Sequence, residues 1–353
     1  MSASKIVANG VTTVRDMGSD LAELDRWRVQ ISENTLVRPT ITRAGPMLNA
    51  MEFNPYQLAV ADAAEARAAV RTLRKVGIDF VKLHRRTSRE AYFAIAAEAR
   101  TLRFPFSAHV PMTVSPGEAS DAGQASIEHT ETLFEGTFAA EHAGKDQTAE
   151  IARWRANEAT ALFTKFFRND TFVDPTLIAQ TQLVRLLETG KPDPHAQYVA
   201  ATARNEAERT LAAIRRAAEK VLLERRPLLR ELQAVTAFMN QTGVRLLAGT
   251  DLSYFHSPGF SLHDELALLA ESGLTAADAL RAATVNPARL FPSLEVGSIA
   301  PGQRADLVVL DANPLEDIRN TQRISGVVLR GRYLNSQDLD RLLRESARLA
   351  TSN

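Results

Sequence analysis

The chain has 353 residues, a formal net charge of zero at pH 7 and no cysteine. This length fits one barrel domain with a small appendage, and the balanced charge gives no sign of a polyanionic partner such as nucleic acid. The absence of cysteine excludes disulfides and thiolate metal ligands. No run of about 18 apolar residues predicts a membrane-spanning helix.

The first part of the sequence alternates predicted strands with predicted helices. VTTVRD (11–16) and TITRAGP (40–46) are predicted strands, because β-branched residues favour strands, and residues 20–33 between them have helical spacing. Residues 61–77 form an Ala-rich amphipathic pattern that stops at Gly77, as a helix does. We therefore expect consecutive strand–helix units.

Four short apolar runs further along the chain each end in a residue that can take part in a metal site. The runs are FVK (80–82), FSAH (106–109), SIEH (126–129) and RLLAGTD (245–251), and they end in Lys82, His109, His129 and Asp251. A (β/α)₈ barrel builds its active site from such residues at the C-terminal tips of successive strands. The intervals from Lys82 to His109 and from His109 to His129 each suit one strand–helix unit. The pattern predicts an active site at the C-terminal face of a barrel.

The second half of the barrel carries a long helical region. Residues 137–235 are rich in Ala, Glu and Arg with a 3.6-residue period, which predicts helices that decorate the barrel. FVDPTLI (172–178) is the predicted barrel strand inside this region. Thr275 and Asp278 give a T-x-x-D helix start, and we expect Asn286-Pro287 to end that helix.

After about residue 293 the pattern changes to alternating strands set off by Gly and Pro turns, in residues 297–311 and 324–334. We therefore divide the chain into two units. The first, residues 1–292, is the predicted barrel with the helical insertion at about 137–235. The second, residues 293–353, consists of these predicted strands followed by a terminal helix, and the family resemblance described next implies that it is half of a β-sandwich.

Long stretches of the chain resemble the amidohydrolase superfamily, in particular its imidazolonepropionase-like and Xaa-Pro dipeptidase-like branch. The stretches are ANGVTTVRDMG (8–18), GIDFVKLH (77–84), SAHVPMTVSPGEASDAGQASIEH (107–129), LLAGTD (246–251), SLHDELALLAESGLTAADALRAATVNPARLF (261–291) and GSIAPGQRADLVVLDANPLEDI (297–318). The resemblance implies an α/β fold, a (β/α)₈ TIM-like barrel with a small β-sandwich built from both ends of the chain.

One part of the family pattern is missing. The family's first barrel strand ends in a His-x-His pair that supplies two metal ligands, upstream of the segment that matches residues 8–18. Only seven residues precede that segment here, and no two of the seven histidines are separated by a single residue. We therefore expect a barrel without its first strand and a partial β-sandwich, as in an N-terminally truncated family member.

By the same resemblance, Lys82 corresponds to a carbamylated lysine that bridges two divalent metal ions. His109 and His129 correspond to ligands of the second ion, and Asp251 to a ligand of the first ion that accepts a proton from the attacking water. An unmodified lysine is a poor ligand because its ammonium has no lone pair. Neutral imidazole suits zinc, so we expect zinc, as one or two ions.

Each of these residues also has an interpretation without catalysis. Lys82 could be a strand-end lysine that reaches solvent, and His109 and His129 could be core or surface histidines. Asp251 could be a turn residue that caps the next helix.

Two classes of function stay open from the sequence. The first is a metal-dependent hydrolase of an amide, cyclic amide or dipeptide C–N bond, with Asp251 as the catalytic residue and Tyr254 and His256 as substrate contacts in the following loop. The second is an impaired or inactive barrel that only binds a ligand or partner. In both cases we expect a small-molecule ligand, no nucleic acid, no membrane and a cytoplasmic location, with a homo-oligomer as an option.

Overall fold

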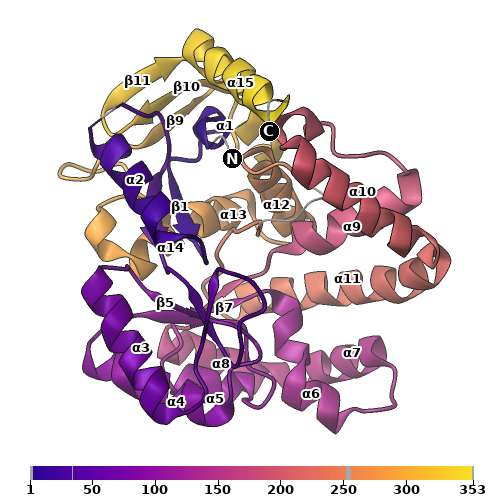
Figure 1. The fold of residues 1–353 in the computed structure, drawn as a ribbon. Coiled ribbons are helices and arrows are strands. Elements are labelled where there is room, and N and C mark those ends of the chain that lie inside the picture. The colour runs from indigo at the N-terminus through magenta and orange to yellow at the C-terminus, as the bar shows by residue number, and fades with distance from the viewer. Residues whose placement is uncertain (1–2, 34, 252–255, 352–353) are drawn as a thin grey trace.

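The computed structural model describes residues 3–33, 35–251 and 256–351. Its centre is a set of short strands, drawn as arrows in Figure 1: β1 (Thr13–Asp16), β2 (Thr40–Arg43), β3 (Met47–Asn49), β4 (Gln57–Ala59), β5 (Val81–Leu83), β6 (Phe106–Ala108), β7 (Ser126–Glu128) and β8 (Phe172–Asp174). β1 and β2 form a parallel pair, and the other six form a parallel sheet in the order β4-β3-β5-β6-β7-β8. The predicted α/β class with a central parallel sheet is therefore confirmed.

Helices follow the strands and cover their outer side (Figure 1). The first are α2 (Leu21–Ser32), α3 (Ala63–Val76), α4 (Arg89–Thr101) and α5 (Pro116–Asp121). α3 begins after Asp62, whose carboxylate accepts two backbone N–H groups, and it ends at Gly77 with a left-handed φ of 81°. α3 and α4 bury apolar side chains such as Val70 and Ile95 in one core with β5 and β6.

The strand predicted over 40–46 is split into β2 and β3. Gly45 has a φ of 69° and Pro46 has no N–H to donate, so the ladder cannot continue through them. β3 still pairs with β5. The Asp79 carboxylate just before β5 accepts the backbone N–H of Arg43 at the end of β2. Both pieces therefore lie beside β5.

Residues 137–235 are helical as predicted, apart from β8 and its connections. The helices between β7 and the segment 245–251 are η1 (Thr130–Phe134), α6 (Gly136–Glu141), α7 (Gln147–Asn157), α8 (Ala159–Asn169), α9 (Leu177–Thr189), η2 (Ala196–Tyr198), α10 (Ala201–Arg215) and α11 (Ala218–Gln241). α7, α8 and α11 share one core that includes Ile151, Phe163, Phe166, Val235 and Met239. These helices pack against the side of the sheet that carries β7 and β8.

Two predicted strands are shorter than expected. The strand predicted over 172–178 stops at Asp174 because Pro175 follows it, and α9 begins at Leu177. The strand predicted over 245–251 is reduced to one parallel bridge, between Leu246 and Val173 of β8.

Gly249 explains why the strand over 245–251 is so short. Its backbone passes so close to the Asp174 carboxylate that a Cβ on Gly249 would collide with it. The Gly249 N–H donates a hydrogen bond of 2.9 Å to Asp174 Oδ1. At Gly249 the backbone therefore hydrogen-bonds to the Asp174 side chain instead of continuing the backbone pairing with β8.

The helices after the last strand are α12 (Phe260–Glu271), α13 (Ala276–Ala283), α14 (Val285–Leu290) and η3 (Pro292–Leu294). The Thr275 hydroxyl accepts the backbone N–H of Asp278, which confirms the predicted start of α13. The prediction that Asn286-Pro287 ends this helix is wrong, because α13 already ends at Ala283 and Pro287 lies in the first turn of α14. A proline fits there because first-turn N–H groups have no partner within the helix.

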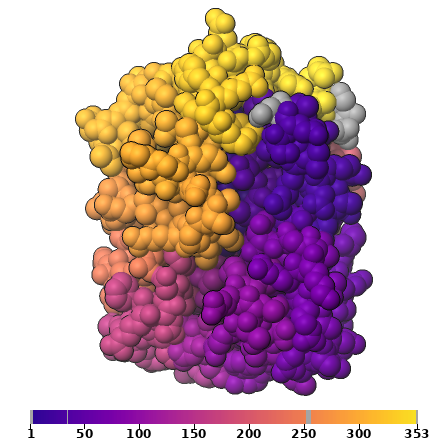
Figure 2. Space-filling model, turned by 90° about the vertical axis from the view of Figure 1, so that its left-hand side faces the viewer, coloured from indigo at the N-terminus to yellow at the C-terminus, as the bar shows by residue number. Residues whose placement is uncertain are grey.

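The C-terminal part is an antiparallel sheet followed by a helix. It consists of β9 (Leu307–Leu310), η4 (Ile318–Gln322), β10 (Ile324–Leu329), β11 (Arg332–Asn335) and α15 (Ser336–Thr351), with the strand order β11-β10-β9. The short α1 (Ser4–Ala8) joins this layer, and Val7 packs with Val327, Leu334 and Leu342. Figure 2 shows the indigo N-terminal residues lying against the yellow C-terminal layer. A domain boundary at 292/293 stays a prediction.

No helix in the described ranges is both long enough and apolar enough to cross a membrane.

Candidate active site

Three of the predicted site residues line one cavity of about 240 Å³. His109 follows β6, His129 follows β7, and Asp251 follows the segment that bridges to β8. The ring centroids of His109 and His129 are 4.9 Å apart. The Nε2 atom of His129 lies 3.8 Å from Asp251 Oδ2. The parallel strands thus bring residues that are far apart in the sequence to one place.

Lys82 lies in β5 and is buried, with 2% of its surface exposed. This burial excludes the interpretation of Lys82 as a strand-end lysine that reaches solvent. Burial lowers the pKa of Lys82 to about 8, the Glu128 carboxylate opposes this shift, and the Arg15 guanidinium reinforces it. A lowered pKa raises the fraction of neutral amine, which is the form that can react with carbon dioxide to give a carbamate.

The histidines of the cavity favour the neutral state. Burial lowers the pKa of His109 well below its usual range, and the charge of Lys82 lowers it further. Burial also lowers the pKa of His129, although Asp251 opposes this shift. The Nδ1 atom of His109 is buried and has no hydrogen-bond partner among the described residues. A neutral imidazole with a free lone pair is the form that binds a metal ion.

His84 also lines the cavity, and its ring centroid lies 5.0 Å from that of His109. Burial lowers the pKa of His84 to about 4, and Lys82 contributes to the shift. The ring therefore adds a third neutral imidazole to the cavity wall.

His129 and two residues near it have an unusual backbone conformation. His129, Thr176 and Asp251 have φ angles of 66°, 48° and 53°, in the left-handed region. Such angles cost about 1–3 kcal/mol each and persist only where surrounding contacts enforce them. The His129 N–H donates to Asp174 O at 2.8 Å, and its carbonyl accepts the Thr132 hydroxyl at 2.9 Å.

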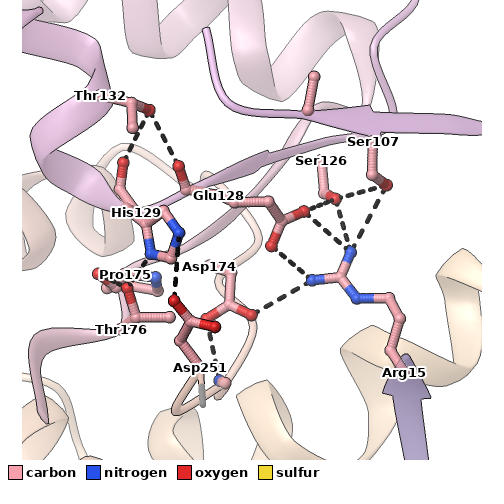
Figure 3. A network of polar contacts seen from close by, with 12 residues as sticks. Arg15, Ser107, Ser126, Glu128, His129, Thr132, Asp174, Pro175, Thr176 and Asp251 are labelled. Atoms are coloured by element: carbon pink, nitrogen blue, oxygen red, sulfur yellow. Dashed lines mark hydrogen bonds and ion pairs between the residues drawn. The ribbon is translucent and has the colours of Figure 1, made fainter. Parts of the chain in front are cut away.

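Arg15 of β1 extends its side chain toward residues of β6, β7 and β8 (Figure 3). Its two terminal nitrogens donate to the Glu128 carboxylate at 3.0 and 2.6 Å, and one of them also lies 3.2 Å from Asp174 Oδ2. It also donates to the Ser126 hydroxyl at 2.7 Å. Sequence reasoning missed this residue, although an arginine inside the predicted strand 11–16 was a signal.

The charges in this network shift the two acids in opposite directions. Burial acts to raise the pKa of Glu128, but Arg15 and then Lys82 bring it below its usual value. Burial raises the pKa of Asp174 to about 7, reinforced by the charge of Glu128 and opposed by Arg15. Glu128 is therefore the ionised partner of Arg15.

The cavity lining is partly polar. Arg85 pairs with Glu135 at 3.0 Å. Gln180 Nε2 donates to Glu131 at 2.5 Å, and Gln180 Oε1 accepts from Arg225 at 2.6 Å. Pro175, Leu177, Ala179 and Leu232 supply the apolar part of the lining. A small substrate would therefore meet both charged and apolar groups.

Of the two predicted substrate contacts, His256 lies within the described residues. Tyr254 lies outside the described residues. His256 is buried, with 2% of its surface exposed, and its Nε2 lies 3.0 Å from the Asp251 carbonyl oxygen. It supports the backbone at Asp251, and its contact with substrate stays a prediction.

The residues present offer donor types that suit a divalent ion, although His109, His129 and Asp251 are not drawn together as a ligand set. Within the described ranges, no three His, Asp or Glu side chains are arranged to hold a metal ion. Lys82, His109, His129 and Asp251 provide four donors only if Lys82 carries a carbamate. The unpartnered Nδ1 of His109 and the neutral state of both histidines suit this donor set.

One family model and one known protein match this chain in sequence. The family model described as "Amidohydrolase family" matches residues 2–334. The imidazolonepropionase of Deinococcus deserti is 41% identical over 86 residues, which make up 24% of this chain and 22% of that protein. The sequence match therefore covers about a fifth of that relative's length.

Three solved structures share the fold. Bottromycin amidohydrolase has a TM-score of 0.80 at 22% identity and covers 99% of this chain and 76% of its own. A Xaa-Pro dipeptidase with bound methionine has a TM-score of 0.68 at 20% identity, covering 95% of this chain and 78% of its own. A putative prolidase from Bifidobacterium longum has a TM-score of 0.67 at 23% identity. The match covers 98% of this chain and 79% of the prolidase chain. At these identities the likeness establishes the architecture alone.

Proposed function

Because this chain belongs to the amidohydrolase family, we propose that it hydrolyses a carbon–nitrogen bond in an amide, a cyclic amide or a dipeptide, with a divalent metal ion such as zinc. The observation that carries the proposal is the meeting of His109, His129 and Asp251 around one cavity, with Lys82 buried in the strand beside them. Neutral imidazoles next to an aspartate are suited to activating water for attack on a carbonyl group.

The residues have separate roles in this proposal. Lys82 as a carbamate, His109, His129 and Asp251 would hold the ion. When bound, the ion would lower the pKa of a water molecule and polarise the substrate carbonyl. Asp251 would accept a proton from the attacking water at a carboxylate oxygen and then deliver it to the leaving nitrogen.

The cavity wall would position the substrate. Leu177 and Leu232 would supply apolar contacts, and the Arg85–Glu135 pair would supply charge. Tyr254 and His256 are proposed as further substrate contacts in the loop after Asp251.

Activity measurements test the proposal directly. The purified chain is incubated with zinc or manganese and a panel of dipeptides, N-acyl amino acids and lactams, and released product is quantified. Asp251→Asn is expected to lower kcat/KM by about 10²–10⁴-fold, because it removes the proton acceptor. The matched control is Asp340→Asn, an exposed residue of α15. Equal activity of Asp251→Asn and wild type would overturn the proposal.

A non-catalytic barrel that only binds ligand is the second candidate. It is favoured by the lack, within the described ranges, of three metal-ligating His, Asp or Glu side chains. A chain that is stabilised by small amides but turns over none of them with any metal would support this candidate.

A further inference from the structure

Helix α12 carries a buried carboxylate that holds the start of another helix. Glu265 is completely buried. Its Oε1 accepts the backbone N–H of Leu177 at 3.0 Å, and its Oε2 accepts that of Ile178 at 2.7 Å. Leu177 and Ile178 are the first residues of α9, and their N–H groups have no partner within that helix. The preceding residue, Thr176, makes no side-chain cap. Glu265 therefore supplies the cap from outside α9.

Thr176 connects this cap to the cavity. Its φ of 48° is unusual for a β-branched residue, so its conformation depends on the fixed chain that follows it. The Thr176 hydroxyl has a single hydrogen, and it donates this hydrogen to the Pro175 carbonyl at 2.8 Å. The same hydroxyl lies 2.5 Å from His129 Nδ1. If the hydroxyl keeps its hydrogen on the Pro175 carbonyl, it accepts in this second contact.

With the hydroxyl as acceptor, the ring hydrogen of His129 sits on Nδ1, whereas the reverse donor assignment would place it on Nε2. In the first assignment Nε2 carries the lone pair, and it is the atom that lies 3.8 Å from Asp251 Oδ2. Two electron-pair donors that face each other at this distance are arranged to share a cation. The opposite tautomer would place a hydrogen between them and block ligation.

We propose that Glu265 is a positioning residue: it fixes the first turn of α9, this turn fixes Thr176, and Thr176 fixes His129 in the tautomer whose Nε2 lone pair faces the cavity. The consequence for catalysis rests on the proposed function. The contacts and the tautomer do not depend on the proposed function, so they can be tested without measuring enzymatic turnover.

The test reads the tautomer of His129 by NMR. Ring nitrogens are labelled with ¹⁵N in the full chain, and spectra are recorded at about pH 8, where an ordinary imidazole is neutral. The His129 signals are assigned from their loss in His129→Gln. We expect an Nδ1–H pattern in wild type, a changed pattern in Thr176→Val, and the wild-type pattern in Thr176→Ser, which keeps the hydroxyl.

Glu265 is tested with two variants. Glu265→Gln keeps the volume but can accept only one of the two N–H groups, and Glu265→Asp keeps the carboxyl group but shortens the reach. In either variant that folds, we expect amide exchange at Leu177 and Ile178 to rise at least about tenfold and the His129 pattern to change. Glu271→Gln, at an exposed position of the same helix, should change neither. Failure of both Glu265 variants to fold, while Thr176→Val folds with the wild-type His129 pattern, would overturn the proposal.

The outcomes also separate this inference from the proposed function. If wild type is active, Glu265→Gln should lower kcat about tenfold or more while KM stays within about twofold. A folded Glu265→Gln variant with unchanged amide exchange and an unchanged His129 pattern overturns the positioning role whether or not the chain is active. If wild type is inactive but the His129 pattern still changes in the Glu265 variants, the positioning role is supported and only the proposed function fails.

Discussion

At the scale of single residues, a buried network of one arginine and two acids stabilises the interior next to the candidate site. Arg15 places both terminal nitrogens against Glu128 and one of them near Asp174. This arrangement is a two-pronged, charge-assisted pair, which is among the stronger polar contacts in proteins. Its loss would leave the buried Glu128 without its paired guanidinium, and removing one partner of a buried ion pair is strongly unfavourable.

Arg15→Met is therefore expected to lower the free energy of unfolding by about 3–5 kcal/mol. Arg15→Lys should recover part of this loss, because lysine keeps the charge but lacks the planar fork. Urea denaturation followed by circular dichroism measures both. Arg332→Met, at an exposed position of β11, is the matched control and should change stability by less than about 0.5 kcal/mol. Similar values for Arg15→Met and the control would contradict the role of this network.

The sequence identified some site residues and missed others for a physical reason. His109, His129 and Asp251 follow predicted strands, and parallel strands bring their ends together, so local pattern was sufficient. Thr176 and Glu265 act through contacts between segments distant in sequence, which no local pattern contains. An acid within the apolar helix SLHDELALLAE was the only signal for Glu265.

At the scale of elements, a helix start can be predicted where its cap comes from neighbouring residues. The Thr275 cap of α13 is an example, with its hydroxyl 3.1 Å from the Asp278 nitrogen. Strand ends were predicted less well. The segment 245–251 leaves the ladder because of a contact between Gly249 and Asp174, and this contact lies far away in the sequence.

Thr275→Ala should lower the free energy of unfolding by about 1 kcal/mol, because an N–H at the start of α13 loses its acceptor. Thr202→Ala, at an exposed position of α10, is the control and should change stability by less than about 0.5 kcal/mol. Thermal and urea denaturation measure both variants. Equal effects of the two substitutions would show that the cap does not stabilise α13.

The attachment of α1 predicts a pH dependence. Lys5 is 1% exposed, and its Nζ donates to the Tyr198 carbonyl of η2 at 2.6 Å. Burial lowers the pKa of Lys5 from 10.5 to about 8, and Asp193 opposes the shift. Between these two pKa values the unfolded chain binds more protons than the folded one, so this residue makes stability rise with pH in that window.

The stability difference between wild type and Lys5→Met should therefore shift in favour of wild type from about pH 7.5 to about pH 10.5, by at most about 3 kcal/mol. Taking the difference removes the general effect of alkaline pH on both proteins. Lys191→Met, at an exposed position, should show a difference that is independent of pH. A constant difference for Lys5→Met as well would exclude a lowered pKa.

At the scale of the whole molecule, the two ends of the chain share one core. Val7 of α1 packs with Val327 of β10 and Leu342 of α15, and Lys5 reaches the helical insertion at Tyr198. The class of fold followed from alternating strands and helices. The separation of β1 and β2 from the six-stranded sheet did not, because it depends on how the strands meet in space.

The central claim is that Lys82, His109, His129 and Asp251 hold a divalent ion. The most direct test is the metal content of the full chain by inductively coupled plasma mass spectrometry, after loading with zinc and bicarbonate and extensive dialysis. We expect about one zinc ion per chain in wild type, and less than about a tenth of that in Lys82→Ala and His109→Ala, because each variant loses a ligand. Lys220→Ala, at an exposed position of α11, should retain the wild-type content. A folded wild-type chain without zinc, or a Lys82→Ala variant that binds as much as wild type, would contradict the account.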